Sequence, residues 1–228
     1  MRHLQREIDR LKRHMLALGA VVEQNLRLAF HAIEARDAAA AREVIATDLI
    51  IDQNEVELEE ECLKILALYQ PVASDLRFIM AVVKINNELE RIGDLAANIG
   101  ERAISLSEAD LVPIPQGLTR MADCTNAIIE KALDSLVRED AITARRVLAA
   151  DDEIDALYAD LIETLKDVIR AHPEQLDATV LLFSVARALE RLADHATNIA
   201  EDVLYMVEGE IHRHQNPEAL SDVFGVDT

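Results

Sequence analysis

Two stretches of the sequence repeat one pattern of acidic and amide side chains. In NNELERIGDLAANIGE, residues 86–101, the pattern consists of Glu90, Asp94, Asn98 and Glu101. In ARALERLADHATNIAE, residues 186–201, it consists of Glu190, Asp194, Asn198 and Glu201. Each residue of an α-helix advances by about 100°, so each set falls on one strip of a helix surface. The apolar residues of both stretches fall on the opposite side, which predicts that the strips face away from the core.

Such strips are unfavourable unless something compensates for their charge. Each pair of like charges at i,i+4 destabilises a helix by about 0.2–0.5 kcal/mol. Carboxylate and amide oxygens are the ligands that hard multivalent cations prefer. The preceding helix of each half carries the same spacing, in Asp48 with Asp52 and in Asp151 with Asp155. An antiparallel helix pair would therefore set two groups of oxygen ligands against each other in each half.

We predict one metal site in each half of the chain, holding one or more divalent or trivalent ions. The spacing does not select among iron, zinc, manganese and magnesium. The two amides are expected to complete the coordination and the last Glu of each strip to close it. The predicted ligands are Asp48, Asp52, Glu90, Asp94, Asn98, Glu101, Asp151, Asp155, Glu190, Asp194, Asn198 and Glu201. Arg91 and Arg191 lie at the edge of the strips, either holding carboxylates around the metal or acting as plain ion-pair partners.

Three other interpretations compete with a regulatory metal site. Acidic residues number 43 of 228, so a single acid pair at this spacing carries little weight and a solvated acidic face is the simplest alternative. A helical-bundle metal-storage or oxidase protein would use Glu three residues before His, and no histidine here has that neighbour. A helical scaffold without metal is the third. Because the sequence also lacks a phosphate-binding glycine loop and a nucleophile elbow, we expect no enzyme and no catalytic residue.

The composition indicates that helices position these side chains. Half of the residues are hydrophobic, only 3% are aromatic, and the chain has six glycines and five prolines. This composition predicts an all-α protein. Turn signals divide it into six helical segments, at residues 4–35, 38–69, 74–108, 115–137, 140–171 and 174–210.

An internal repeat divides the six helices into two groups. Residues 36–52 align with residues 139–155 at an offset of 103, and the two acidic strips align at an offset of 100. The predicted fold is therefore two tandem, pseudo-repeated antiparallel three-helix bundles. We place the first domain at residues 1–110 and the second at residues 111–228, joined through the LVPIPQG run.

Charge and apolar patterning limit the partners and the compartment. The formal net charge of −20 argues against binding to nucleic acid and favours cations or basic protein surfaces. No apolar run reaches the roughly 20 residues that span a bilayer, so membrane contact is expected only through partners. The charged N-terminus and the two distant cysteines predict a reduced, cytoplasmic protein.

Several single residues have modest expected roles. Cys62 and Cys124 are read as small core residues. His195 is read as a hydrogen-bonded residue at the core boundary, with a metal ligand as the alternative. Ser74 or Asp75 is expected to cap the third helix ahead of Arg77. No role is expected for the last two histidines, which are His212 and His214.

The duplicated motifs resemble the PhoU family of bacterial phosphate-transport regulators. The resemblance is carried by QPVASDLR at 70–77, NNELERIGDLAANIGERA at 86–103, ALERLADHATNIAEDVLYM at 188–206 and the DxxxD segments at 48 and 151. It implies two three-helix bundles whose E(D)xxxD motifs bind clusters of iron or zinc-type metals on the surface. The family pattern has a His after the second acid, which is His195 in the second half, whereas the first half departs from the pattern with Leu95.

The resemblance also implies a function. PhoU proteins are negative regulators of phosphate uptake and of the phosphate-starvation response. The resemblance implies a homodimer that contacts the ATP-binding subunit of the phosphate ABC transporter and a membrane sensor histidine kinase. The chain would then be cytoplasmic and recruited peripherally to the inner face of the cell membrane.

Overall fold

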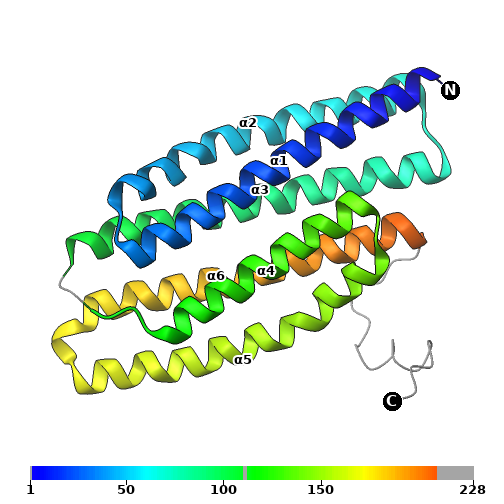
Figure 1. The fold of residues 1–228 in the computed structure, drawn as a ribbon. Coiled ribbons are helices and arrows are strands. Elements are labelled where there is room, and N and C mark those ends of the chain that lie inside the picture. The colour runs from blue at the N-terminus through cyan, green and yellow to red at the C-terminus, as the bar shows by residue number, and fades with distance from the viewer. Residues whose placement is uncertain (1, 110–111, 210–228) are drawn as a thin grey trace, which may run out of the picture.

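The chain folds into six long α-helices that lie side by side (Figure 1). This is a computed structural model that describes residues 2–109 and 112–209. The helices are α1 (Arg2–Ala35), α2 (Ala38–Tyr69), α3 (Ala73–Glu108), α4 (Gln116–Arg138), α5 (Ala141–Ala171) and α6 (Leu176–Glu208). A short 3₁₀ turn, η1 (Pro173–Gln175), precedes α6.

The helix limits agree with the sequence prediction to within two residues at every end that can be compared. The one internal difference is η1, where the proline interrupts the start of the last predicted helix. Three positions named in the predictions lie outside the described residues. They are residue 210, where the sixth helix was predicted to end, and His212 and His214. Within the described part of the chain, no helix is both long and apolar enough to cross a bilayer.

The helix ends show which short-range signals the chain uses. Asp37 and Asp140 are the N-caps of α2 and α5, and each carboxylate accepts hydrogen bonds from two backbone N–H groups. The prediction of a side-chain cap for α3 was wrong: Val72 occupies the N-cap position, and no side chain caps the helix. Asp75 instead lies in the first turn, where the helix dipole favours a negative charge.

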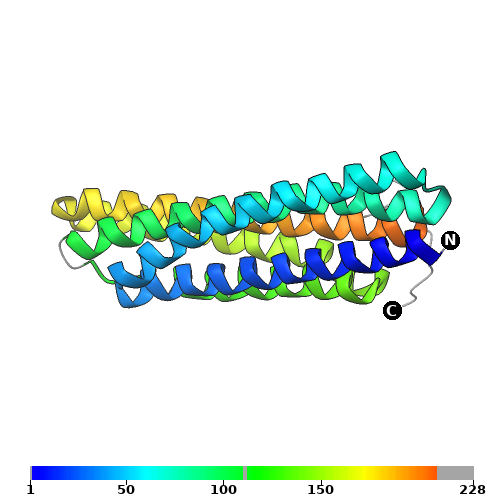
Figure 2. The ribbon, with the colours of Figure 1, turned by 90° about the horizontal axis from the view of Figure 1, so that it is seen from above.

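The predicted two-bundle architecture is confirmed. Helices α1, α2 and α3 pack against one another, as do α4, α5 and α6, and the halves meet through α3 with α6 and α1 with α4. Figures 1 and 2 show an elongated molecule, and in Figure 1 α2 and α5 lie at its opposite edges. The acid-bearing helices α3 and α6 therefore run through the middle, each with its outer partner α2 or α5 on one side.

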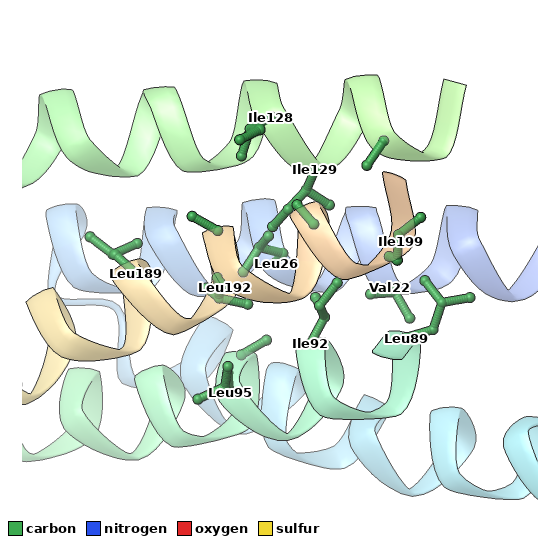
Figure 3. Packing of buried hydrophobic residues seen from close by; sticks show 14 of the residues in the cluster. Val22, Leu26, Leu89, Ile92, Leu95, Ile128, Ile129, Leu189, Leu192 and Ile199 are labelled. Carbon is green, nitrogen blue, oxygen red and sulfur yellow. The ribbon is translucent and has the colours of Figure 1, made fainter. Parts of the chain in front are cut away.

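The apolar sides of the two strip-bearing helices form the centre of the molecule. Leu89, Ile92 and Ile99 of α3 are fully buried, and so are Leu189, Leu192 and Ile199, their counterparts on α6. Figure 3 shows some of these side chains directed at one another and at α1 and α4. This packing confirms the predicted core face and fixes the rotation of both helices, so the acidic strips point outward from the centre.

The contact between the halves follows an approximate two-fold symmetry. Lys84 Nζ lies 2.9 Å from Asp202 Oδ1, joining α3 to α6. The repeat, at an offset of 100 residues, relates Lys84 to Ser184 and Asp202 to Arg102. At this symmetry-related place, Arg102 Nε donates to Ser184 Oγ at 3.2 Å. The duplicated sequence thus produces two symmetry-related contacts at the joint between the halves, and different side chains form each of them.

The cysteines pack much as predicted. Cys62 is buried in the first bundle, and burial raises the pKa of its thiol to about 12. Cys124 is only half-buried, at the edge of the core. Both are free thiols.

Candidate metal centre

The first acid cluster depends on a close approach between α2 and α3. A methyl group built on Gly93 would lie 3.1 Å from Ile51 Cδ1 and 3.2 Å from Asp48 Oδ1. One built on Gly100 would lie 3.1 Å from the backbone oxygen of Ala41. The two glycines let the helices come together, and the contact at Gly93 sets Asp48 against the acidic strip of α3.

Asp48, Asp52, Glu90 and Asp94 form what we call the first acid cluster. The pKa of Asp48 is raised to about 6, first by burial and then by the negative charges of the other three acids. The pKa of Glu90 is also raised, by burial and by Asp94. Asp48 Oδ1 is buried and has no hydrogen-bond partner among the described residues. The predicted meeting of two acid pairs across an antiparallel helix pair is therefore present in this half.

The second acid cluster, Asp151, Asp155, Glu190 and Asp194, repeats the arrangement between α5 and α6. Burial raises the pKa of Asp151 to about 6, and the neighbouring acids add to the shift. Burial also raises the pKa of Glu190 and Asp194, with repulsion from Asp194 and Asp155, respectively, as the next cause. Glu190 Oε2 is buried and lacks a hydrogen-bond partner within the described part of the chain.

The outer members of the strips lie farther from these clusters. Glu101 follows Gly100, which packs beside Ala41, about 10 Å along α2 from Asp48. Asn98 is exposed, and its side-chain amide donates to the backbone oxygen of Asp94 at 2.8 Å. Their inclusion as ligands stays a prediction.

In the second half the corresponding amide is already engaged. Asn198 Nδ2 donates to Glu88 Oε2 of α3 at 3.2 Å, so this end of the amide is directed at the joint between the halves. Glu201 lies three residues further along α6 and is half-buried. For both residues the metal-ligand role likewise stays a prediction.

The arginine at the edge of the first strip pairs with the acids beside it. Arg91 lies 3.6 Å from Glu90 Oε2 and 3.8 Å from Asp94 Oδ2. These long, exposed pairs offset part of the repulsion but contribute little stability individually. Burial raises the pKa of Glu190 and Asp194 and outweighs the positive charge of Arg191, which acts in the opposite direction.

His195 is a half-buried, hydrogen-bonded residue, as predicted, and its partner lies on the other half of the chain. Its Nδ1 lies 2.6 Å from Glu88 Oε2 of α3. Glu88 was not among the residues predicted from the sequence, although the repeat contains a signal for it. The positions related to Glu88 and His195 are Ala188 and Leu95, so both members of a polar pair are replaced together by apolar residues.

Glu55 is a second acid that the sequence analysis missed. Its pKa is raised by burial, then by the charges of Glu59 and Asp52, and its own charge contributes to the raised pKa of Glu90. Glu55 follows Asp48 by seven residues and therefore lies on the same side of α2. This seven-residue spacing in the sequence could have identified Glu55 as a neighbour of the cluster. The second half has Tyr158 at the matching position, so this extension belongs to the first half alone.

The donors present suit a hard multivalent cation. Both clusters consist of carboxylates, and each contains a buried oxygen that has no hydrogen-bond partner among residues 2–109 and 112–209. A bound cation would satisfy that oxygen and replace repulsion among the acids with attraction. In residues 2–109 and 112–209, no three His, Cys, Asp or Glu side chains converge closely enough to enclose an ion. The ligand set is therefore proposed from its chemistry and its duplication.

These features define the chain as a tandem helical-bundle protein with a duplicated surface acid cluster. The PhoU domain matches it twice, at residues 15–103 and 118–203, once in each bundle. The chain belongs to the PhoU family.

Individual relatives and solved structures agree with this assignment. The phosphate-specific transport system accessory protein PhoU homolog of Aquifex aeolicus is 36% identical over 92% of this chain and 96% of the relative. The crystal structure of PhoU from Pseudomonas aeruginosa superposes with a TM-score of 0.87 at 35% identity, over 90% of this chain and 99% of that one. The phosphate transport system regulatory protein PhoU from Streptococcus pneumoniae gives a TM-score of 0.84 at 26% identity, over 91% and 98%.

Proposed function

We propose that this chain is a negative regulator of phosphate uptake and of phosphate-starvation signalling. In this role it is a metal-binding adaptor between the ATP-binding subunit of a phosphate ABC transporter and a sensor histidine kinase. The observation that carries the proposal is the similarity, over nearly the whole chain, to proteins named as accessory to the phosphate-specific transport system. An adaptor transmits a signal by protein contacts, so the role requires no catalytic residue.

The acid clusters give this adaptor a way to respond to metal ions. Asp48, Asp52, Glu90 and Asp94 would hold a cation in the first half, and Asp151, Asp155, Glu190 and Asp194 would hold one in the second. Each cation would bridge an outer helix to a central one and thereby stiffen the bundle. Iron, zinc, manganese and magnesium all remain compatible with an all-oxygen ligand set.

The proposed assembly is a homodimer in the cytoplasm. It would reach the inner face of the cell membrane through the transporter and the kinase rather than through lipid. The elongated shape offers separate lateral surfaces for two partners (Figure 2). The formal net charge of −20 favours basic protein surfaces as those partners.

Gene deletion tests the regulatory role. In cells that grow in high phosphate, deletion should release the expression of phosphate-starvation genes, and a plasmid copy of the natural chain should restore repression. Expression that stays repressed in the deletion strain would contradict the assignment.

A further inference from the structure

The outward face of α2 carries a row of exposed apolar side chains. Leu49 is 72% exposed, Val56 49% and Leu63 57%. They follow one another at intervals of seven residues and so lie along one line of the helix, over about 21 Å. Large apolar side chains grouped in this way on a protein surface typically mark a contact with another molecule.

The internal repeat shows that the fold does not need these apolar residues. The buried residues of α2 and α5 correspond at an offset of 103, as in Ile51 with Ile154 and Leu58 with Leu161. At the same offset the exposed row of α2 corresponds to Asp152, Ala159 and Lys166 of α5, which are exposed as well. At these three positions α5 thus has the surface expected of a solvated helix, and α2 does not.

Acidic residues border the row on the side that faces the first acid cluster. Asp52 and Glu59 are exposed and lie next to the row on the helix wheel, and neither forms an ion pair within the described part of the chain. Glu55 lies farther round on the same side. The second half has no acid at the positions of Glu55 and Glu59, where it has Tyr158 and Ile162. The first half therefore differs from the second in two respects at once, an exposed apolar row and additional acids beside it.

We propose that this face of α2, comprising Leu49, Asp52, Val56, Glu59 and Leu63, binds a basic amphipathic helix of a partner protein. A partner helix with an apolar residue at every seventh position would pack along the row, as helices do at small crossing angles. Its Lys or Arg side chains would meet Glu59 and, in the metal-free chain, Asp52. A second copy of this chain fits less well, because it would bring the same acids to the same edge. The inference rests on the proposal that the chain works through protein contacts.

A peptide-binding measurement on the full chain tests this surface. The probe is a synthetic 21-residue helix with Leu at every seventh position and flanking Lys residues, labelled for fluorescence anisotropy. A second peptide carries Glu in place of each Lys. Binding is measured in EDTA, so that the result is independent of metal. We expect the Lys peptide to bind the natural chain at least about tenfold more tightly than the Glu peptide, and higher salt to weaken it.

The repeat supplies matched variants. The first exchanges the row for the α5 residues, Leu49→Asp, Val56→Ala and Leu63→Lys, which leaves the net charge and the bordering acids unchanged. We expect it to keep the natural melting temperature and to lose at least about tenfold in affinity for the Lys peptide. The reverse exchange on α5, Asp152→Leu, Ala159→Val and Lys166→Leu, should not restore this affinity when combined with the first. The reason is that α5 keeps an acid at the position of Asp52 but has Ile162 in place of Glu59.

Two results would overturn the proposal. One is equal binding of the Lys peptide by the natural chain and the first variant. It would show that the apolar row does not contribute and that only unspecific charge attraction holds the peptide. The other is a change of the first variant from dimer to monomer in sedimentation, which would show that a second copy covers the row. A failed gene-deletion test with intact peptide binding would instead contradict the proposed phosphate regulation and leave this surface in place.

Discussion

At the residue scale, the negative charges of Asp48 and Asp151 destabilise the metal-free protein at neutral pH. Each has a pKa raised to about 6 by burial and by neighbouring acids. A folded-state pKa above the ordinary value means that the folded chain holds these protons more tightly than the unfolded chain. The stabilisation is therefore complete below about pH 4 and is lost as the pH rises through about 6. Metal-free protein should become more stable as the pH falls from about 7 to about 5.

The substitution Asp48→Asn tests this account. It removes a charge that is unfavourable at pH 7, so we expect the metal-free variant to melt about 2–4 °C higher, corresponding to about 1 kcal/mol after solvent screening is allowed for. Its melting temperature should also depend less on pH between about 5 and 7. Asp160→Asn, an exposed acid of α5 outside the clusters, is the control and should change little. A lower melting temperature for Asp48→Asn in EDTA would contradict the conclusion that the charge of Asp48 is unfavourable.

The sequence identified these acids but not every neighbour of theirs. The spacing of Glu90 and Asp94, and its repetition at Glu190 and Asp194, was enough to predict the strips and the side on which they lie. Glu88 escaped because its partner, His195, is on the other bundle, and helical periodicity within one segment carries no information about a contact between halves.

At the scale of helices, the contact between α2 and α3 in the first bundle involves two glycines. Gly93 and Gly100 of α3 lie against α2, whereas the matching positions of α6 are Ala193 and Ala200. The repeat predicted which helices pair, because the buried positions of α2 and α5 correspond. It did not predict that these glycines contact α2, since a Gly in a helix indicates only a local weakness until its neighbour is known.

Two glycine substitutions distinguish close packing from helix propensity. Gly100→Ala would place a methyl group 3.1 Å from a backbone oxygen of α2, which cannot move alone, so we expect a destabilisation of about 1 kcal/mol. Gly19→Ala meets only the end of the Leu133 side chain at 3.4 Å and should stabilise the chain by about 0.5–1 kcal/mol through helix propensity. Urea unfolding of both variants provides the comparison. Equal stabilisation by the two would show that α2 and α3 are not closely packed at Gly100.

At the scale of the whole molecule, duplication explains both what is shared and what differs. The two bundles share the core, the helix order and the acid clusters, all of which the repeat made predictable. They differ along α2, where the exposed apolar row occurs in one half only, and at the joint, where Glu88 meets His195 on one side of the approximate symmetry axis. These differences depend on partners and on the opposite bundle, so a reading of one repeat at a time does not find them.

Isothermal titration of metal-stripped protein with Mn²⁺ shows whether each acid cluster binds a multivalent cation. We expect the natural chain to bind equal numbers of ions in its two halves. The pair Asp48→Asn and Asp94→Asn should remove half of that stoichiometry, and the pair Asp151→Asn and Asp194→Asn should remove the other half. Zinc and ferrous ions, titrated without oxygen in the ferrous case, would show which metal binds most tightly. Absence of binding by the natural chain to all three ions, or an unchanged stoichiometry in both paired variants, would contradict the account.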